Sequence, residues 1–304
     1  MDLPATGHES VLLDEVLSWV APRPGGTVVD CTVGRGGHSL AIAQRMEPSG
    51  LLIGLDVDQR NLEYAQPRLA EARTRVRLFH ANFANIADVL KEAEVDAVDG
   101  ILADLGLSTN QFLDPQYGMS FAQDMPLDMR LDLRIRQTAA DLVNHLREPD
   151  LADVLYNLAQ ERYSRRIARK IAEARRISPI TTTGRLAEIV RSAIGKRSGA
   201  PEKIDPATRT FLALRMCVNQ EIQKLQAFLA TAPRLLKPGG RLAVISFQST
   251  EDRLVKQAFR STAESGLFDV LTKKPISPTE AEIARNPRSR SAKLRVLLRR
   301  PEGP

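Results

Sequence analysis

The chain has 304 residues, 43% of them hydrophobic, so it can bury one large core or two modest ones, and no run of eighteen apolar residues predicts a membrane span. The first eight residues lack the pattern of a signal peptide, and two cysteines, Cys31 and Cys217, make neither a disulfide framework nor a metal site, so a cytoplasmic protein without metal is expected. The net charge of +6 favours a polyanionic partner.

A helix, a strand and a glycine-rich turn are predicted first. Apolar residues recur at helical spacing over 10–20, and we expect this helix to lie across the sheet edge just ahead of the first strand. The apolar run at 28–29 leads into Asp30-Cys-Thr-Val-Gly-Arg-Gly-Gly-His38, and a helix is predicted over 39–46. Glycines without Cβ let main-chain N–H groups approach a ligand, and the helix N-terminus adds donors. This order is typical of a nucleotide-binding turn.

A second apolar run, 51–55, ends in Asp56-Val-Asp58. A carboxylate at the tip of the second strand is where nucleotide-binding α/β proteins hold a ribose diol, so an adenosine-bearing cofactor is expected. The turn departs from the pyrophosphate-binding G-x-G-x-x-G pattern, because Ser39 occupies the third glycine position and Gly36 and Gly37 are adjacent. We therefore favour S-adenosylmethionine over NAD.

Strands and helices continue to alternate up to residue 104. Helices are predicted over 59–70 and 83–91, and strands over 76–79 and 98–104. The alternation predicts a parallel sheet with right-handed crossovers, in which ligands bind beyond the carboxyl ends of the strands. Polar residues at these ends are Asp30, Asp56, Asn82 and Asp104. We expect them to converge on one pocket.

The next stretch, 105–128, has no sustained period, which is typical of a functional loop. Helices are then predicted at 138–146, 150–159, 161–176 and 183–194. The third carries seven basic and two acidic residues. We expect it to contact phosphates, with a merely solvated face as the alternative.

The segment 196–203 has the composition of a flexible exit from this inserted unit. One long helix is predicted over 207–236, a turn over 237–241, a buried strand over 242–247 and a last strand over 292–299. A helix is predicted from 248, with Ser249 or Thr250 as its N-cap. The fold class is therefore α/β, a Rossmann-like sheet with an inserted all-helical subdomain.

Six ordered motifs carry a family resemblance. They are Val29-Asp-Cys-Thr-Val-Gly-Arg-Gly-Gly-His-Ser39, Asp104-Leu-Gly-Leu-Ser-Thr-Asn-Gln111, Pro126-Leu-Asp-Met-Arg-Leu-Asp132, Pro206-Ala-Thr-Arg-Thr-Phe211, Val218-Asn-Gln-Glu221 and Ile245-Ser-Phe-Gln-Ser-Thr-Glu-Asp-Arg253. Over residues 8–299 the chain resembles the small-subunit (16S) ribosomal RNA cytosine-N4 methyltransferase family.

The resemblance implies a class I S-adenosylmethionine-dependent methyltransferase. It implies methyl transfer to the exocyclic amine of one cytidine in the decoding region of 16S ribosomal RNA, in the small ribosomal subunit. The methyltransferase domain would comprise 1–112 and 205–304, and the insert 113–204 would recognise the RNA. A homodimer is left open.

The resemblance places cofactor contacts at Gly37, His38, Ser39, Asp56, Phe83, Asp104 and Gln111. The turn is implied to hold the methionine end, Asp56 the ribose hydroxyls and Phe83 the adenine face. Asp104 and Gln111 are expected where the sulfonium and the target amine meet. Considered alone, His38 would equally suit a helix start satisfied by local backbone, and Phe83 the hydrophobic core.

Catalysis is predicted to be direct. Methylation at cytosine C5 needs a thiolate, but neither cysteine lies in the loop after the fourth predicted strand. Transfer to N4 needs no covalent intermediate, only acceptors that hold the amine in line. Asp104 is predicted as that acceptor or as the proton sink, with backbone carbonyls up to Ser108 beside it. The target base is expected to leave its stack.

The chain departs from the family pattern at four places, which include Tyr117, Met125, Asp205 and Gln248. Tyr117 replaces an arginine, which could weaken a phosphate contact, and Gln248 replaces a histidine, which removes an imidazole. Asp128 and Asp132 around Arg130 are interpreted as a set of salt bridges within the loop.

Two alternatives belong to other functional classes. A nicotinamide-dependent oxidoreductase would use the glycine turn and Asp56, but Ser39 disfavours it. A ribosome-assembly factor would use the basic insert and keep the cofactor pocket as a vestige.

Overall fold

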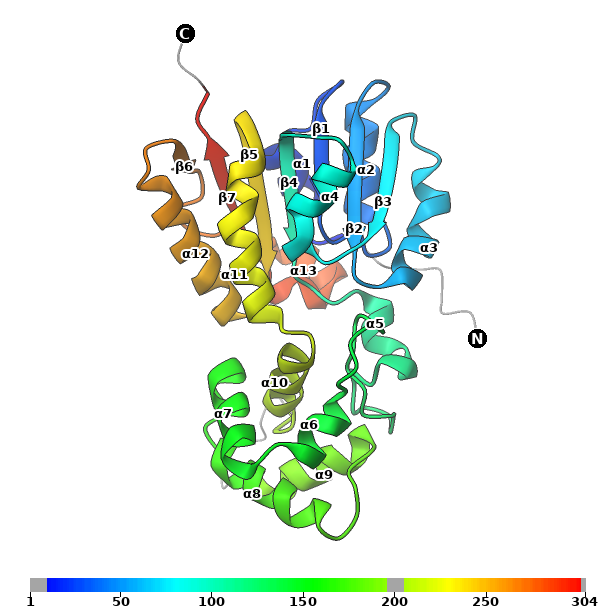
Figure 1. Cartoon of the computed structure of the whole chain (residues 1–304), viewed down its shortest axis with the longest axis vertical. Helices are drawn as coiled ribbons and strands as arrows, with labels where there is room; N and C mark the ends of the chain where they lie inside the picture. Colours follow the sequence, from blue (N-terminus) through cyan, green and yellow to red (C-terminus); the bar gives the residue numbers. More distant parts are fainter. Residues whose placement is uncertain (1–9, 196–204, 302–304) are drawn as a thin grey trace. The chain divides into compact units, whose positions relative to one another are not determined.

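The computed structural model describes residues 10–195 and 205–301, which form two compact units (Figure 1). The first unit takes the chain up to Ser108 and again from Ile222, and the second spans Thr109–Glu221. The second unit is longer than the expected insert 113–204, because the helix Thr208–Val218 packs against the helix Glu148–Ala159 within it. The expected exit segment 196–203 lies outside the described residues.

A seven-stranded sheet forms the centre of the first unit, with the order β3-β2-β1-β4-β5-β7-β6. Strands β1 to β5 pair in parallel, and β7 is antiparallel to both β5 and β6. The strands are β1 Thr27–Asp30, β2 Leu51–Asp56, β3 Arg75–His80, β4 Val98–Asp104, β5 Leu236–Ser246, β6 Phe268–Val270 and β7 Lys293–Arg299. The expected α/β fold with a largely parallel sheet is confirmed.

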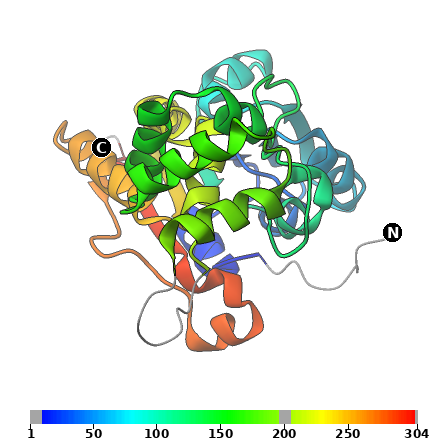
Figure 2. The same ribbon diagram turned by 90° about the horizontal axis from the view of Figure 1, so that it is seen from below.

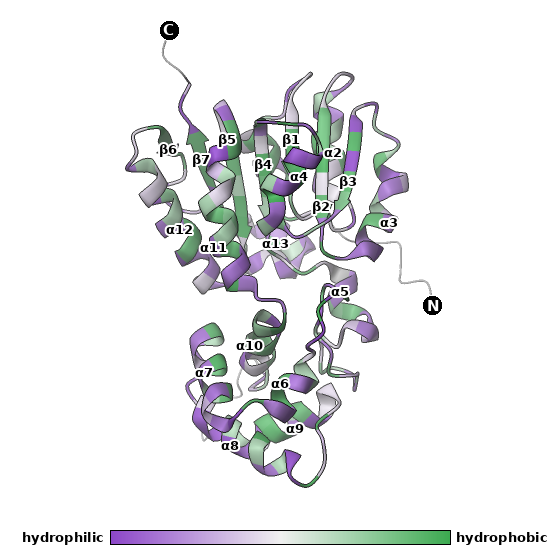
Figure 3. Cartoon of the chain, in the orientation of Figure 1, coloured by the Kyte–Doolittle hydropathy of each residue, from purple (hydrophilic) through white to green (hydrophobic). Residues whose placement is uncertain are grey.

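Two hydrophobic clusters cover the two faces of this sheet. Successive strand residues point to opposite faces, so Val28 joins the cluster that contains α1, α2 and α3, and Val29 joins the cluster with α4, α11 and α12. Strands buried on both faces read as continuous apolar runs, and Figure 3 colours the central strands largely as hydrophobic. The helices are α1 Leu13–Val20, α2 Gly37–Met46, α3 Gln59–Leu69, α4 Ile86–Glu92, α11 Glu221–Thr231, α12 Ser249–Ala263 and α13 Glu280–Arg285. No helix in the described ranges is long and apolar enough to cross a membrane.

The N-terminal helix does not lie at the sheet edge, so that expectation was wrong. Helix α1 contacts β4 and β5 in the middle of the sheet. Its buried residues Val16, Leu17 and Val20 pack on the same face as Leu102 and Ala243. Burial of this apolar stripe is greatest over the central strands, which explains the position.

The long helix predicted over 207–236 is two helices and a 3-10 turn. Helix α10, Thr208–Val218, and α11 are separated by Asn219 and Gln220, and the Gln220 backbone is left-handed with φ 53°. The 3-10 turn Ala232–Leu235 leads directly into β5, which begins at Leu236 and takes in the predicted turn 237–241. Apolar periodicity continues across the Asn219 break, so the sequence pattern alone conceals it.

The N-cap of α12 is Gln248, not Ser249 or Thr250 as predicted. The Glu251 carboxylate accepts the backbone N–H groups of Phe247 and Gln248, both at 3.0 Å. These bonds satisfy donors just before the helix, so it begins one residue earlier than a Ser249 cap predicts and two earlier than a Thr250 cap predicts.

The second unit is helical, and its helices are α5 Thr109–Leu113, α6 Ala139–His145, α7 Glu148–Ala159, α8 Ser164–Arg175, α9 Thr183–Ile194 and α10. Helix α7 packs against α8 and α10, and α8 against α9. The expected elementless loop 105–128 holds the short α5 and a 3-10 turn, Pro115–Tyr117. The helices predicted between 138 and 194 are confirmed within a few residues.

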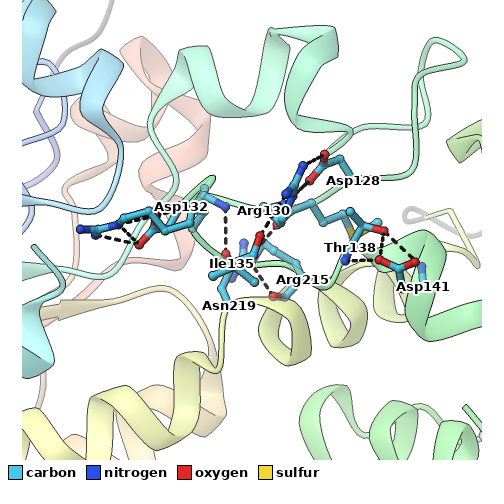
Figure 4. Close-up of polar contacts among 11 residues, drawn as sticks. Asp128, Arg130, Asp132, Ile135, Thr138, Asp141, Arg215 and Asn219 are labelled. Carbon is cyan, nitrogen blue, oxygen red and sulfur yellow. Dashed lines mark hydrogen bonds and ion pairs between the residues drawn. The ribbon is translucent and has the colours of Figure 1, made fainter. Parts of the chain in front are cut away.

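A polar network organises the segment between the 3-10 turn and α6 (Figure 4). Arg130 donates from Nε and Nη2 to both carboxylate oxygens of Asp128, at 2.7 and 2.8 Å, and Arg134 pairs with Asp132 at 2.8 Å. The interpretation of Arg130 as part of a loop salt bridge is confirmed. Asn219 closes the network by donating to the Met129 carbonyl at 2.8 Å and accepting from the Leu131 N–H at 2.9 Å.

Three of the departures from the family pattern have structural roles in this unit. Tyr117 and Met125 are buried, with 2% and 4% of their surface exposed. Asp205 accepts from Arg191 at 2.8 Å and from the Ala207 N–H at 2.8 Å, which fixes the chain just before α10. Because Tyr117 is a core residue here, it does not occupy the exposed position that a phosphate contact needs.

Candidate functional site

The turn between β1 and α2 has the backbone that its glycines predict. Gly34 and Gly36 lie in the left-handed region, with φ of 53° and 81°. A Cβ on Gly36 would come within 3.2 Å of the Ala65 side chain, and one on Gly37 would collide with the Ser10 hydroxyl. The turn therefore packs tightly against both neighbours, and α2 begins directly at Gly37. The first-turn N–H groups of a helix have no intrahelical acceptor. Gly37 is partly exposed and can offer its N–H to a ligand, whereas His38 and Ser39 are buried, so their cofactor contacts stay predictions.

Asp56, the last residue of β2, is bonded to this turn. Its Oδ2 accepts the Gly34 N–H at 2.7 Å, and its Oδ1 accepts the Asp58 N–H at 2.8 Å, with Asn61 Nδ2 at 3.4 Å from both oxygens. Burial raises the pKa of Asp56 to about 6, although these bonds oppose the shift. Each carboxylate oxygen accepts more than one hydrogen bond, so Asp56 can still accept a hydroxyl pair.

Asp30 and Thr32 connect the end of β1 with the end of β4. Asp30 is fully buried, and its two oxygens accept the Ser39 hydroxyl at 2.6 Å and the Thr32 N–H at 3.1 Å. Thr32 Oγ1 in turn accepts the Asp104 N–H at 2.7 Å. Burial raises the pKa of Asp30, and the Ser39 bond opposes this. The Ser39 hydroxyl is thus bonded to the protein and the whole residue is buried, so its contact with the cofactor stays a prediction.

His38 lies beside Asp104, the last residue of β4. The imidazole Nε2 is 2.9 Å from the Val11 carbonyl oxygen, which can only accept, so Nε2 carries a proton and Nδ1 faces Asp104 Oδ2 at 3.9 Å. Asp104 Oδ1 accepts the Gly106 N–H at 3.1 Å. Burial raises the pKa of the Asp104 carboxyl, the neighbouring His38 opposes the rise, and Asp30 adds to it. A carboxylate with an imidazole at one side suits an acceptor of protons.

Three further residues were predicted for the site, and they are Phe83, Ser108 and Gln111. Phe83 is half-buried and meets the Phe228 ring edge-on at 5.5 Å, so it belongs partly to the core, as its apolar character alone suggests. Ser108 is buried and ends the first unit. Gln111 is buried in α5 of the second unit, and its approach to Asp104 stays a prediction. In the described ranges, no group of three or more potential ligands could hold a metal ion.

Residues 5–300 match the model of the MraW methylase family. The chain belongs to this family. Proteins named ribosomal RNA small subunit methyltransferase H are similar to it over nearly their whole length. The one from Geotalea uraniireducens is 45% identical, with 95% of this chain and 97% of that one covered. Those from Syntrophotalea carbinolica and Koribacter versatilis are both 46% identical, with 96% of this chain and 98% and 94% of theirs covered.

This MraW-family protein is therefore a class I methyltransferase that uses S-adenosylmethionine, and the expected family, fold and cofactor are confirmed. Because the chain belongs to this family, the two alternatives are excluded. They were a nicotinamide-dependent oxidoreductase and a ribosome-assembly factor that keeps its cofactor pocket as a vestige. The residues present fit the cofactor: the partly exposed Gly37 begins α2 with an N–H that has no intrahelical acceptor, and Asp56 and Asp104 lie at the carboxyl ends of parallel strands. Negative side chains there suit a ligand that carries a sulfonium.

The MraW-family chain also uses residues that the sequence reasoning missed. Asp30 was placed at a strand end but was given no partner, and its bonds to Ser39 and Thr32 make it the internal support of the site. The Leu12 N–H donates to Glu282 at 2.8 Å, which fixes the backbone next to the carbonyl that holds His38. The sequence signal for Asp30 was a polar residue at the end of a buried strand. Leu12 and Glu282 are 270 residues apart, so no local pattern could predict their contact.

Proposed function

We propose that this enzyme methylates N4 of a specific cytidine in the decoding region of 16S ribosomal RNA, in the small ribosomal subunit. The relatives' names support a small-subunit RNA substrate, and the six motifs support cytosine N4. The observation that carries the proposal is the Asp104 carboxylate at the end of β4, with the His38 ring at 3.9 Å. We place the reaction in the cytoplasm and leave the homodimer as a prediction.

The chemistry of the two cysteines supports nitrogen as the acceptor atom. Carbon-5 methylation of cytosine requires a thiolate that attacks the ring. Burial raises the pKa of Cys31 well above its usual value, so this thiol stays protonated, and Cys217 belongs to α10 of the second unit with its pKa also raised by burial. Neither cysteine therefore supplies the nucleophile that the carbon reaction needs.

Asp104 has two tasks in the proposed reaction. Its carboxylate accepts a hydrogen bond from the exocyclic amine, which keeps the nitrogen lone pair directed at the methyl group. S-adenosylmethionine supplies that methyl group as an electrophile. As the new nitrogen–carbon bond forms, the methyl–sulfur bond would break and the thioether S-adenosylhomocysteine would leave. The nitrogen would then lose a proton, which Asp104 Oδ2 would receive. The Gly106 N–H at 3.1 Å from Oδ1 holds the carboxylate in orientation.

The second unit supports RNA recognition through α8. This helix buries an apolar stripe that includes Ile167, Ala168 and Ile171 against its neighbours. Its exposed side carries mostly cations: Arg165, Arg166, Arg169 and Lys170. Cationic side chains fixed on one helix face bind phosphates without reading sequence. We therefore assign RNA positioning to this unit.

Methyl transfer with product identification tests the proposal. Small subunits that lack the modification are incubated with enzyme and S-adenosylmethionine labelled in its methyl group, and the RNA is digested to nucleosides. We expect label in N4-methylcytidine from one position. Label in 5-methylcytidine, or none in cytidine, would contradict the proposal.

A further inference from the structure

We propose that a cationic patch on the methyltransferase unit binds the phosphate backbone of the RNA substrate beside the active site, in addition to α8. The patch consists of Lys273, Lys274, Arg285, Arg288 and Arg290, all exposed. It lies in the segment between β6 and β7, coloured orange to red in Figure 2. The inference rests on the proposed function in one respect, that the bound polyanion is the RNA substrate.

The sheet register places this segment at the carboxyl end of the parallel strands, where Asp104 lies. Asp104 pairs with Ile245 near the end of β5, and the last residue of β5, Ser246, pairs with Lys293 at the start of β7. The patch residue Arg290 lies in the 3-10 turn Pro287–Ser291, immediately before β7. An antiparallel bridge between Ile276 and Leu294 holds the loop of Lys273 and Lys274 at the same edge.

Buried contacts anchor the backbone that carries these cations. Glu282 of α13 accepts the Leu12 N–H at 2.8 Å, and Ile276 and Leu294 exchange hydrogen bonds of 2.9 and 2.8 Å. Ser289 is fully buried, and its carbonyl accepts the Ala292 N–H at 2.7 Å. The charges are therefore displayed on an ordered surface, which lowers the entropy lost when they meet a polyanion.

Charge in this segment is strongly one-sided. Its acids are Glu280, which is exposed, and Glu282, whose carboxylate is already bonded inside the protein. Between 271 and 292 the segment thus has five exposed cationic side chains and one exposed acidic side chain. The next two cations along the chain behave differently, because both pair with Asp252: Lys293 lies 3.5 Å from it, and the buried Arg295 donates to it at 2.6 Å.

An RNA substrate fits this surface better than other polyanions for a geometric reason. The base to be methylated must reach Asp104 at the carboxyl edge of the sheet, so the strand that carries it passes over the residues that flank that edge. Lysine and arginine contact phosphates without regard to sequence and position the strand. The patch is a cationic surface that the register places there within the first unit.

A triple variant tests the inference. Lys273→Ala/Lys274→Ala/Arg290→Ala removes three exposed charges, and the matched control Arg45→Ala/Arg73→Ala/Arg75→Ala removes three from the opposite edge, where α2 ends and β3 begins. Affinity for transcribed 16S ribosomal RNA is measured across salt concentrations. We expect the patch variant to bind at least about tenfold more weakly and its salt slope to fall by about two. Affinity for S-adenosylmethionine should stay within twofold, which shows that the variant is folded.

RNA affinity and salt slope equal to those of the control variant would overturn the inference. So would unchanged RNA binding together with lost binding to vesicles of anionic lipid, because the patch would then serve a membrane surface. Methyl transfer by the wild-type enzyme is measured in the same preparation. Its absence contradicts the proposed function, whereas weaker RNA binding by the patch variant still supports the phosphate contact, so the two failures are distinguishable.

Discussion

The three aspartates at the strand ends, Asp30, Asp56 and Asp104, differ in their hydrogen-bond partners. Both carboxylate oxygens of Asp30 accept hydrogen bonds from within the protein, one from the Ser39 hydroxyl and one from the Thr32 N–H. Asp56 and Asp104 are bonded on one side by backbone and retain acceptor capacity on the other. Asp30 thus serves as an internal support, and we propose that Asp56 accepts hydrogen bonds from the cofactor and Asp104 accepts the proton, according to their burial and partners.

Asp104→Asn tests the role of charge at the active site. The amide oxygen can still accept the Gly106 N–H, but it cannot take a proton from the amine, so we expect kcat to fall by about 10²- to 10³-fold. The matched control Asp96→Asn changes an exposed acid in the turn before β4 and should leave kcat unchanged. Single-turnover methyl transfer provides the measurement. A kcat within threefold of wild type would remove Asp104 from catalysis.

Asp56 predicts a pH dependence of cofactor affinity. Its charged form accepts the ribose hydroxyls best, and burial raises its pKa to about 6, so affinity should be full above that value. Below it, affinity should fall by up to about tenfold per pH unit as the carboxylate takes up its proton. Calorimetric titration from pH 5 to 8 measures this. Asp56→Asn should bind weakly and lose the part of the pH dependence near 6, and a wild-type profile that rises on acidification would contradict the assignment.

At the scale of elements, the sequence pattern predicted the strands and helices of 27–104 well and those of the later part of the chain less well. Strands β1, β2 and β4 are buried apolar runs that end in acids, and each signal is local. The Asn219 break depends on contacts with the backbone at Met129 and Leu131, about ninety residues away, so no local pattern announces it. Strand β6 has three residues and α13 has six, which is too short for periodicity. Gln111 was placed in the site by family resemblance alone, and its role there stays a prediction.

Asn219→Ala tests the element boundary in the second unit. The substitution leaves the Leu131 N–H and the Met129 carbonyl without their side-chain partner at a buried position. We expect the free energy of unfolding of this unit to fall by about 2–3 kcal/mol. Chemical denaturation followed by circular dichroism gives the value.

A neighbouring control separates the hydrogen bonds from the backbone turn. Gln220 is exposed with φ 53°, so Gln220→Gly should stabilise the unit by up to about 1 kcal/mol. Equal destabilisation by both variants would contradict a specific role for the Asn219 side chain.

At the scale of the whole molecule, each unit supplies a different part of the function. The sheet unit carries Asp56 and Asp104, for which we propose cofactor binding and proton acceptance, and the helical unit displays the cations of α8. Arg165→Ala/Arg166→Ala/Arg169→Ala should reduce the salt slope of RNA binding by about two and leave cofactor affinity unchanged. Filter binding over a salt series measures the slope, and a slope equal to that of wild type would assign α8 to a solvated surface.

The most direct test of the account is a crystal structure of the enzyme with S-adenosylmethionine. We predict that the ribose hydroxyls lie within hydrogen-bond distance of the Asp56 carboxylate, that main-chain N–H groups at the start of α2 contact the methionine end, and that the methyl group is directed toward Asp104. A nucleoside bound at another edge of the sheet, with Asp56 and Asp104 both outside contact distance, would contradict the account.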